Sequence, residues 1–234
     1  FGYAFRNTVY MALLNLTLGF IIPVILGLLI SQVRNKRTSR VVQTTTYMPY
    51  FVAPVVVCTL AKEFLKEGGA ITMFLTMFGL PNQNWLAVNS PVFWFINCFL
   101  GIWQGAGYGA IVYIAAINGI DQNLYEAACI DGASRWQRLW NITIPSVVPL
   151  VVMMFTMQIG LVFMTGFDKV LLLYMPTTYE FSDCLSTYTY RMAFSAGNDF
   201  SLSTASGLLQ SIIGTLLLIF GNKMSEKATK MSLF

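Results

Sequence analysis

The sequence predicts an all-α polytopic membrane protein, because charged residues are scarce and leave long uncharged gaps. Of its 234 residues, 56% are hydrophobic and only 10% are charged, whereas charged residues make up roughly a quarter of a typical soluble domain. Each long gap has room for a membrane helix, which needs about 20 apolar residues to cross the hydrocarbon core. These gaps run from Arg6 to Arg34, from Arg40 to Lys62, from Glu67 to Asp121, from Arg138 to Asp168 and from Asp199 to Lys223.

The gaps place five membrane spans within a single transmembrane domain that covers residues 1–234. Pro23 in the first span, and Pro49 and Pro54 in the second, are tolerated in membrane helices as kinks. The short apolar stretch 68–80 predicts an interfacial or re-entrant helix, since it cannot cross the bilayer alone. The expected spans are 9–31, 41–61, 91–117, 146–166 and 201–222, and the expected outer segments are 63–90 and 168–200.

The distribution of Lys and Arg orients these spans, since cytoplasmic loops carry an excess of both residues. If the turn at residues 31–40 is cytoplasmic, segment 118–145 and the C-terminal tail lie on the same side, and nine of the 14 Lys and Arg residues are inside. This orientation puts Phe1 outside. We therefore expect a sixth span ahead of Phe1 in the native protein.

The composition also excludes several kinds of chemistry. The chain has no histidine, which is the commonest metal ligand and acid–base group, and its four cysteines lack metal-binding spacing. It has no phosphate-binding P-loop, so it does not hydrolyse ATP through that motif. A net charge of +4 without a basic stripe gives no indication of nucleic-acid binding. We expect no catalytic residue, no metal site and no cofactor in this chain.

A polar segment, residues 118–145, separates the third and fourth spans. It reads NGIDQNLYEAACIDGASRWQRLWNITIP. Asp121 is placed to cap a short helix, Gly132 to end it in a left-handed conformation, and Ser134 to cap a second short helix over 134–140. Because helices this short are marginal alone in water, we expect a partner surface to dock against them. The plainer alternative is a solvated connector whose charges keep it out of the bilayer.

This segment resembles the EAA loop of ABC importer permeases. The pattern E-A-A-x3-G-x9-I-x2-P is present in full, with Glu126, Gly132, Ile142 and Pro145 at its fixed positions. The rest of the chain is similar to the sugar-transporting branch of this family, the type I, maltose-transporter-like importers. The stretch 174–191 is most similar to permeases for oligo- or polysaccharides in Gram-positive bacteria. The sequences that carry this further likeness are YIAAINGIDQNLY (113–125), NTVYMALL (7–14), the turn at 47–49 and YMPTTYEFSDCLSTYTYR (174–191).

The resemblance implies the permease subunit of an ATP-driven carbohydrate importer in the bacterial cytoplasmic membrane. Its implied partners are a second homologous permease, two ATP-binding cassette ATPase subunits that hold ATP and Mg, and an extracellular solute-binding (lipo)protein that docks on the outer segments. The loop would be the joint to an ATPase, in which Glu126 meets basic residues of that subunit and Gly132 allows the bend. Arg135 and Arg138 would face either acidic residues of the ATPase or lipid headgroups. The residues implied to couple are Glu126, Ala127, Ala128, Asp131, Gly132 and Arg135.

Polar and aromatic side chains within the spans are candidates for the substrate path, because amides can bond sugar hydroxyls and rings can cover apolar sugar faces. Helix–helix hydrogen bonding and glycine packing remain the alternative roles. No ionisable residue lies in the middle of a span, which argues against an ion-coupled secondary transporter or channel. An importer of the same architecture for peptides or other small solutes stays open. The candidates are Tyr47, Asn97, Trp103, Gln104, Tyr108, Gln158 and Gln210.

Overall fold

The computed structural model describes residues 1–164, 166–194 and 199–229. They form helices joined by turns and by a longer irregular segment over 77–91, without a β-strand. In this described part, four continuous helical stretches are long and apolar enough to cross a membrane, and a helix pair bent by 92° is a fifth candidate. The prediction of an all-α polytopic membrane fold is confirmed. The continuous stretches are Gly2–Ser31, Val92–Asn118, Arg135–Leu161 and Phe200–Lys227, and the bent pair is Lys36–Phe51 with Pro54–Thr76.

The first span is a single helical stretch made of α1 (Gly2–Leu14), a π turn (Asn15–Gly19) and α2 (Phe20–Ser31). It begins well ahead of the predicted start at residue 9. Pro23 explains the irregular turn, because it has no N–H for the carbonyl of Gly19, four residues earlier. The helix therefore continues through the proline with one widened turn in place of a break.

The second expected span, 41–61, is divided in the structure. It consists of α3 (Lys36–Tyr47), a 3₁₀ turn (Met48–Phe51) and α4 (Pro54–Leu65), and α5 (Ala70–Thr76) follows. Pro54 cannot donate a backbone hydrogen bond, and Ala53 before it has ψ 138°, as expected for a residue that precedes proline. The carbonyl of Val52, left free by the bend, accepts a 2.7 Å hydrogen bond from Nε2 of Gln104.

Helix α6 (Val92–Asn118) lies at the centre of the bundle and packs on α2, α3 and α9. Its glycines let the neighbours approach: a Cβ at Gly107 would lie 2.0 Å from the carbonyl oxygen of Thr46 in α3. Likewise, a Cβ at Gly27 of α2 would lie 2.9 Å from Cβ of Tyr113 in α6. Close packing therefore accounts for at least one glycine of the 101–113 segment.

The polar segment 118–145 forms α7 (Gln122–Ile130), a sharp turn, α8 (Arg135–Arg138) and a π turn (Leu139–Thr143) that leads into α9 (Ile144–Leu161). The second element is therefore not the separate helix expected over 134–140, since α8 is continuous with the fourth span. Pro145 again explains the π turn, because it has no N–H for the carbonyl of Asn141.

The outer segment after α9 contains α10 (Phe167–Leu173), a 3₁₀ turn (Pro176–Thr178), α11 (Tyr179–Ser182) and α12 (Leu185–Phe194), and α13 (Phe200–Thr229) follows. Asn7 of α1 holds this layer in place, because its Nδ2 donates to the carbonyls of Glu180 and Asp183 at 3.0 and 2.8 Å. The carboxylate of Asp183 also forms an ion pair with Arg191 at 2.5 Å.

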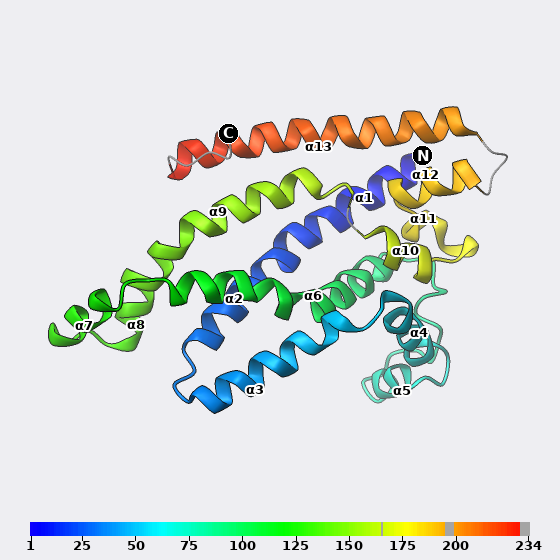
Figure 1. Cartoon of the computed structure of the whole chain (residues 1–234). Helices are drawn as coiled ribbons and strands as arrows, with labels where there is room; N and C mark the ends of the chain where they lie inside the picture. The colour runs from blue at the N-terminus through cyan, green and yellow to red at the C-terminus, as the bar shows by residue number, and fades with distance from the viewer. Residues whose placement is uncertain (165, 195–198, 230–234) are drawn as a thin grey trace.

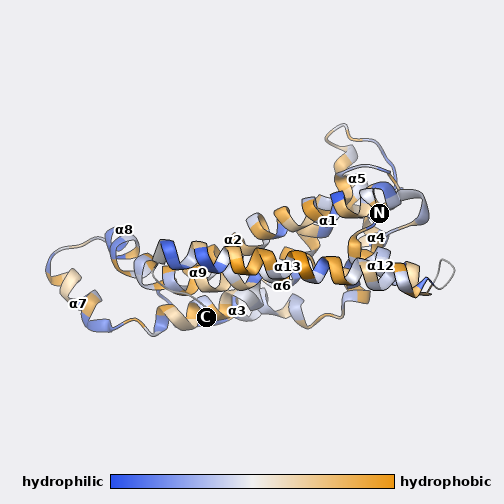
Figure 2. Ribbon diagram, turned by 90° about the horizontal axis from the view of Figure 1, so that it is seen from above, coloured by the Kyte–Doolittle hydropathy of each residue, from blue (hydrophilic) through white to orange (hydrophobic). Residues whose placement is uncertain are grey.

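The long helices run side by side, and the short elements gather at their two ends (Figure 1). The N-terminus, α4, α5 and α10–α12 lie at one end, and α7 and α8 project at the other. Figure 2 shows apolar residues along the middle of α1 and α13, whereas hydrophilic residues are more frequent around α8 and the C-terminal half of α13. The positive-inside count assigns the end that carries α7 and α8 to the cytoplasm.

Candidate coupling element and substrate path

Helix α7 stands apart from the bundle. None of its nine residues is buried. Two side-chain contacts tie it to α8 and the π turn: Tyr125 Oη lies 2.9 Å from Thr143 Oγ1, and Nη1 of Arg138 donates to Cys129 Sγ at 2.8 Å. A helix of this length is marginal without packing. Its apolar side chains nevertheless face out, with Ile130 87% exposed. We therefore expect α7 to pack against a partner.

The turn after α7 is a Schellman motif, in which a left-handed residue ends a helix. Gly132 has φ +77°. The N–H of Ala133 donates to the carbonyl of Ala128 at 2.8 Å, and the N–H of Gly132 donates to the carbonyl of Cys129 at 3.1 Å. These two bonds satisfy carbonyls that the helix end would otherwise leave free. The predicted left-handed Gly132 is confirmed.

Both predicted helix caps of this segment are present. The side chain of Asp121 accepts from the N–H of Asn123 at 2.9 Å. Ser134 and Gln137 form a reciprocal capping box at the start of α8, a pairing that satisfies two free backbone donors. The local sequence therefore builds a firm bend between α7 and α8 without help from the membrane-spanning helices.

The six residues predicted to couple lie together on this bend. Glu126, Ala127, Asp131, Gly132 and Arg135 are exposed, and Ala128 is half-buried. In this single chain, the described residues show neither a hydrogen bond nor an ion pair for the carboxylate of Glu126. It is free to meet a positively charged group, although its role in coupling stays a prediction.

An open cleft of about 500 Å³ lies between the first span, α6 and α9. Two of the predicted substrate-path residues, Asn97 and Gln158, line it. A second cleft of about 640 Å³ adjoins it and is lined by a third, Gln104. The two clefts share Gly105, Gly166 and Lys169 as lining residues, so they form one path along α6 in which a few polar groups lie among apolar ones.

The other predicted substrate-path residues lie elsewhere. Tyr108 stacks on Tyr50, with ring centroids 3.9 Å apart, and it is Tyr50 that lines the second cleft. Trp103 is half exposed outside both linings, and Tyr47 packs beside a small core cluster of α2 and α6. Gln210 lies between α13 and α12, where its amide contacts Ser186 and Thr189, each at 3.4 Å.

Lys169 also lines the clefts, a position that the sequence does not predict, since it places this residue only in the outer segment 168–200. Lys169 lies on α10, just beyond the fourth span, and lines both clefts. A Cβ at Gly101 of α6 would lie 3.8 Å from its Nζ. Burial lowers the pKa of the Lys169 ammonium from its ordinary value. In the described part of the chain, this ammonium has no ion pair.

Several membrane spans, a cleft with polar side chains between them and a projecting helical bend are the features of a multi-pass membrane permease. The chain belongs to the family of binding-protein-dependent transport system inner membrane components, whose model matches residues 19–230. It is thus a permease subunit of an ABC importer.

Two of the relatives that the chain matches come from Bacillus subtilis. The chain is 35% identical to the polygalacturonan/rhamnogalacturonan transport system permease protein YteP over 223 residues, which are 95% of this chain and 69% of YteP. It is 33% identical to the protein LplB of the same organism over 98% of this chain and 72% of LplB. Among solved structures, it is similar to a chain of a bacterial alginate ABC transporter in complex with an alginate pentasaccharide-bound periplasmic protein. That match has a TM-score of 0.92 and 36% identity, and covers 100% of this chain and 81% of the other.

Proposed function

We propose that this permease moves an acidic oligo- or polysaccharide across the membrane by alternating access. It would work beside a second homologous permease, with two ATPase subunits on the cytoplasmic side and an extracellular solute-binding protein outside. The names of its relatives support this cargo, since polygalacturonan and alginate are chains of acidic sugars. ATP and Mg would be bound by the ATPases, and this chain would carry no catalytic group.

The observation that carries the proposed cargo is the cation on the amide-lined path. Amide groups of Asn97, Gln104 and Gln158 line the two clefts, and the ring of Tyr50 offers a flat apolar face. Sugar hydroxyls and sugar C–H faces match these two kinds of surface. Lys169 adds a positive charge without an ion-pair partner among the described residues, next to Asp168, which also lines the second cleft. The Lys169 ammonium would bind a uronate carboxylate, a group that a neutral sugar lacks.

The coupling proposal rests on α7 and the bend at Gly132. Rigid-body movement of an ATPase would be transmitted through α7 to α8, and α8 is continuous with the fourth span. Because α9 also lines the cleft of about 500 Å³ between the first span and α6, such a movement would change the access to that cleft. Glu126 would provide the charged contact to the ATPase, and the small Ala127 and Ala128 would allow close approach.

The test is ATP turnover of the assembled transporter in proteoliposomes, with its solute-binding protein supplied outside. We expect oligogalacturonate or alginate oligomers to stimulate ATP hydrolysis and to accumulate inside, with neutral maltohexaose and a short peptide as comparison cargoes. If only the peptide stimulates ATP hydrolysis, the transporter has the same architecture but imports a different class of solute. Stimulation by maltohexaose equal to that by the acidic oligomers would remove the role assigned to Lys169.

A further inference from the structure

A second cavity, separate from the substrate path, lies at the cytoplasmic end of the bundle. Its volume is about 370 Å³. It is open to the outside and is bordered by the end of α2 and the turn that follows, the end of α6, one side of α7, and α8 with its π turn. The lining residues are Ser31, Gln32, Val33, Arg34, Ile117, Asn118, Gln122, Tyr125, Arg135, Arg138, Leu139 and Thr143.

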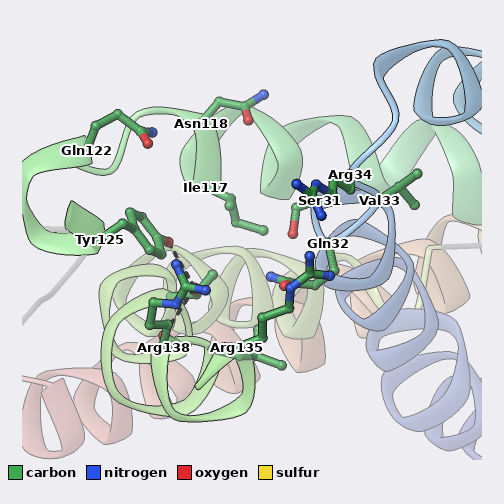
Figure 3. Close-up of a pocket in the computed structure, with 12 residues that line it drawn as sticks. Ser31, Gln32, Val33, Arg34, Ile117, Asn118, Gln122, Tyr125, Arg135 and Arg138 are labelled. Atoms are coloured by element: carbon green, nitrogen blue, oxygen red, sulfur yellow. Dashed lines mark hydrogen bonds between the residues drawn. The ribbon is translucent and has the colours of Figure 1, made fainter. Parts of the chain in front are cut away.

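Three arginines converge on this cavity. Figure 3 shows Arg34 on one side, and Arg135 and Arg138 on the other, turned toward the same space. None of the twelve lining residues is acidic. The two ion pairs found in the described part of the chain join other residues, Lys66 with Glu63 and Arg191 with Asp183. The cavity therefore holds three positive charges without a carboxylate to neutralise them.

Arg138 is the most enclosed of the three. Its Nη1 donates to the Cys129 sulfur, a weak acceptor, while its buried Nε has no acceptor at all. A buried donor without a partner is costly. A planar guanidinium in this state is suited to an anion with several oxygens, because it can donate two parallel hydrogen bonds to it.

The position of the cavity relative to the membrane follows from the neighbouring tryptophans. Trp136 and Trp140, which alternate with the arginines along α8 and the π turn, are 71% and 62% exposed. Exposed tryptophan is enriched where the hydrocarbon core meets the headgroups. We infer that the arginines lie at the depth of the phosphate groups of the cytoplasmic leaflet, where basic side chains attract anionic lipid.

We propose that this cavity binds a phosphate group, held by Arg34, Arg135 and Arg138. The phosphate comes either from the headgroup of an anionic phospholipid or from a phosphorylated solute of the cytoplasm. Because Arg34 follows the first span and the other two arginines begin the fourth, the bound phosphate ties these spans together beside the coupling bend. It neutralises the mutual repulsion of the arginines and fixes α8 relative to α2.

The test uses the assembled transporter with wild-type chain, with the double variant Arg135→Gln/Arg138→Gln, or with Arg37→Gln. Arg37 is the matched control, since it is exposed on α3 and does not line the cavity. Each complex is equilibrated with vesicles of phosphatidylglycerol and phosphatidylcholine, extracted in detergent, and weighed by native mass spectrometry. In a second arm, the melting temperature of each delipidated complex is measured with and without inorganic phosphate.

If the source is lipid, the wild type and Arg37→Gln retain phosphatidylglycerol, and the double variant binds it about 25-fold more weakly, from about fivefold for each arginine. If the source is a soluble phosphate, lipid retention is equal in all three, but inorganic phosphate raises the melting temperature of only the wild type and Arg37→Gln. Equal lipid retention together with equal response to phosphate overturns the proposal. Should the double variant fail to assemble, the single variant Arg135→Gln gives the same comparison with an expected change of about fivefold.

Discussion

The bend between α7 and α8 depends on one backbone conformation, which makes Gly132→Ala a sharp perturbation. Gly132 has φ +77°, and a Cβ there would meet nothing within 4 Å, so the substitution adds backbone strain without a steric clash. A left-handed conformation costs an ordinary L-residue about 1–2 kcal/mol, which changes the population of the formed bend by about 5- to 30-fold. We expect the two Schellman hydrogen bonds at Ala128 and Cys129 to open more often, and α7 to lose its fixed angle to α8.

The assay compares hydrogen exchange at the Ala133 amide with cargo-stimulated ATP turnover of the reconstituted complex. Gly132→Ala should speed exchange about 5- to 30-fold and lower the stimulated turnover, whereas Gly132→Asn should do less, because Asn tolerates the left-handed region better. Gly119→Ala is the matched control, since Gly119 at the end of α6 has φ −82° and needs no special conformation. The reasoning is refuted if Ala133 exchanges as slowly in Gly132→Ala as in the wild type, or if Ala and Asn at position 132 behave alike.

Three further predictions follow from the coupling bend, the cleft and the helix packing. Glu126→Lys should leave assembly of the transporter unchanged but lower cargo-stimulated ATP turnover at least about tenfold, because the loss of one charged hydrogen bond has an effect of that order. Unchanged turnover would show that Glu126 has no coupling role. Because burial lowers the pKa of the Lys169 ammonium, this group loses its charge at a lower pH than an ordinary lysine. Stimulation by an acidic oligomer should therefore fall as the pH rises through that lowered pKa. Lys169→Arg should keep the stimulation at high pH, and identical pH profiles would contradict the assignment. Gly107→Ala should destabilise the protein by about 1–3 kcal/mol, because its Cβ would overlap Thr46 and overpacking costs that much; thermal unfolding against Gly105→Ala, which has open space at its Cβ, checks this.

The features that the sequence predicts well are those set by neighbouring residues. The caps at Asp121 and Ser134 and the left-handed Gly132 each depend on a hydrogen bond within a few positions, so the local pattern suffices. The long uncharged gaps likewise indicate the helices that cross the membrane, because the bilayer imposes the length of each helix.

The features that the sequence could not predict depend on distant partners. Beside the 92° bend in the second expected span, the Val52 carbonyl accepts a hydrogen bond from Gln104, which is about fifty positions away in the chain. The place of Lys169 beside the cleft depends on how α10 folds back toward α6. Gln210 reads as a polar group inside a span, yet its neighbours Ser186 and Thr189 come from a helix whose position no local pattern reveals.

Import of an acidic glycan, driven by ATP that a partner subunit hydrolyses, is the central proposal for this permease. The most direct measurement is uptake of labelled oligogalacturonate into proteoliposomes that contain the assembled transporter, with ATP enclosed and no ion gradient. We expect accumulation that requires ATP and the solute-binding protein, and that falls with Glu126→Lys and with Lys169→Gln. Uptake by this chain alone, driven by a proton or sodium gradient without ATP, would contradict it.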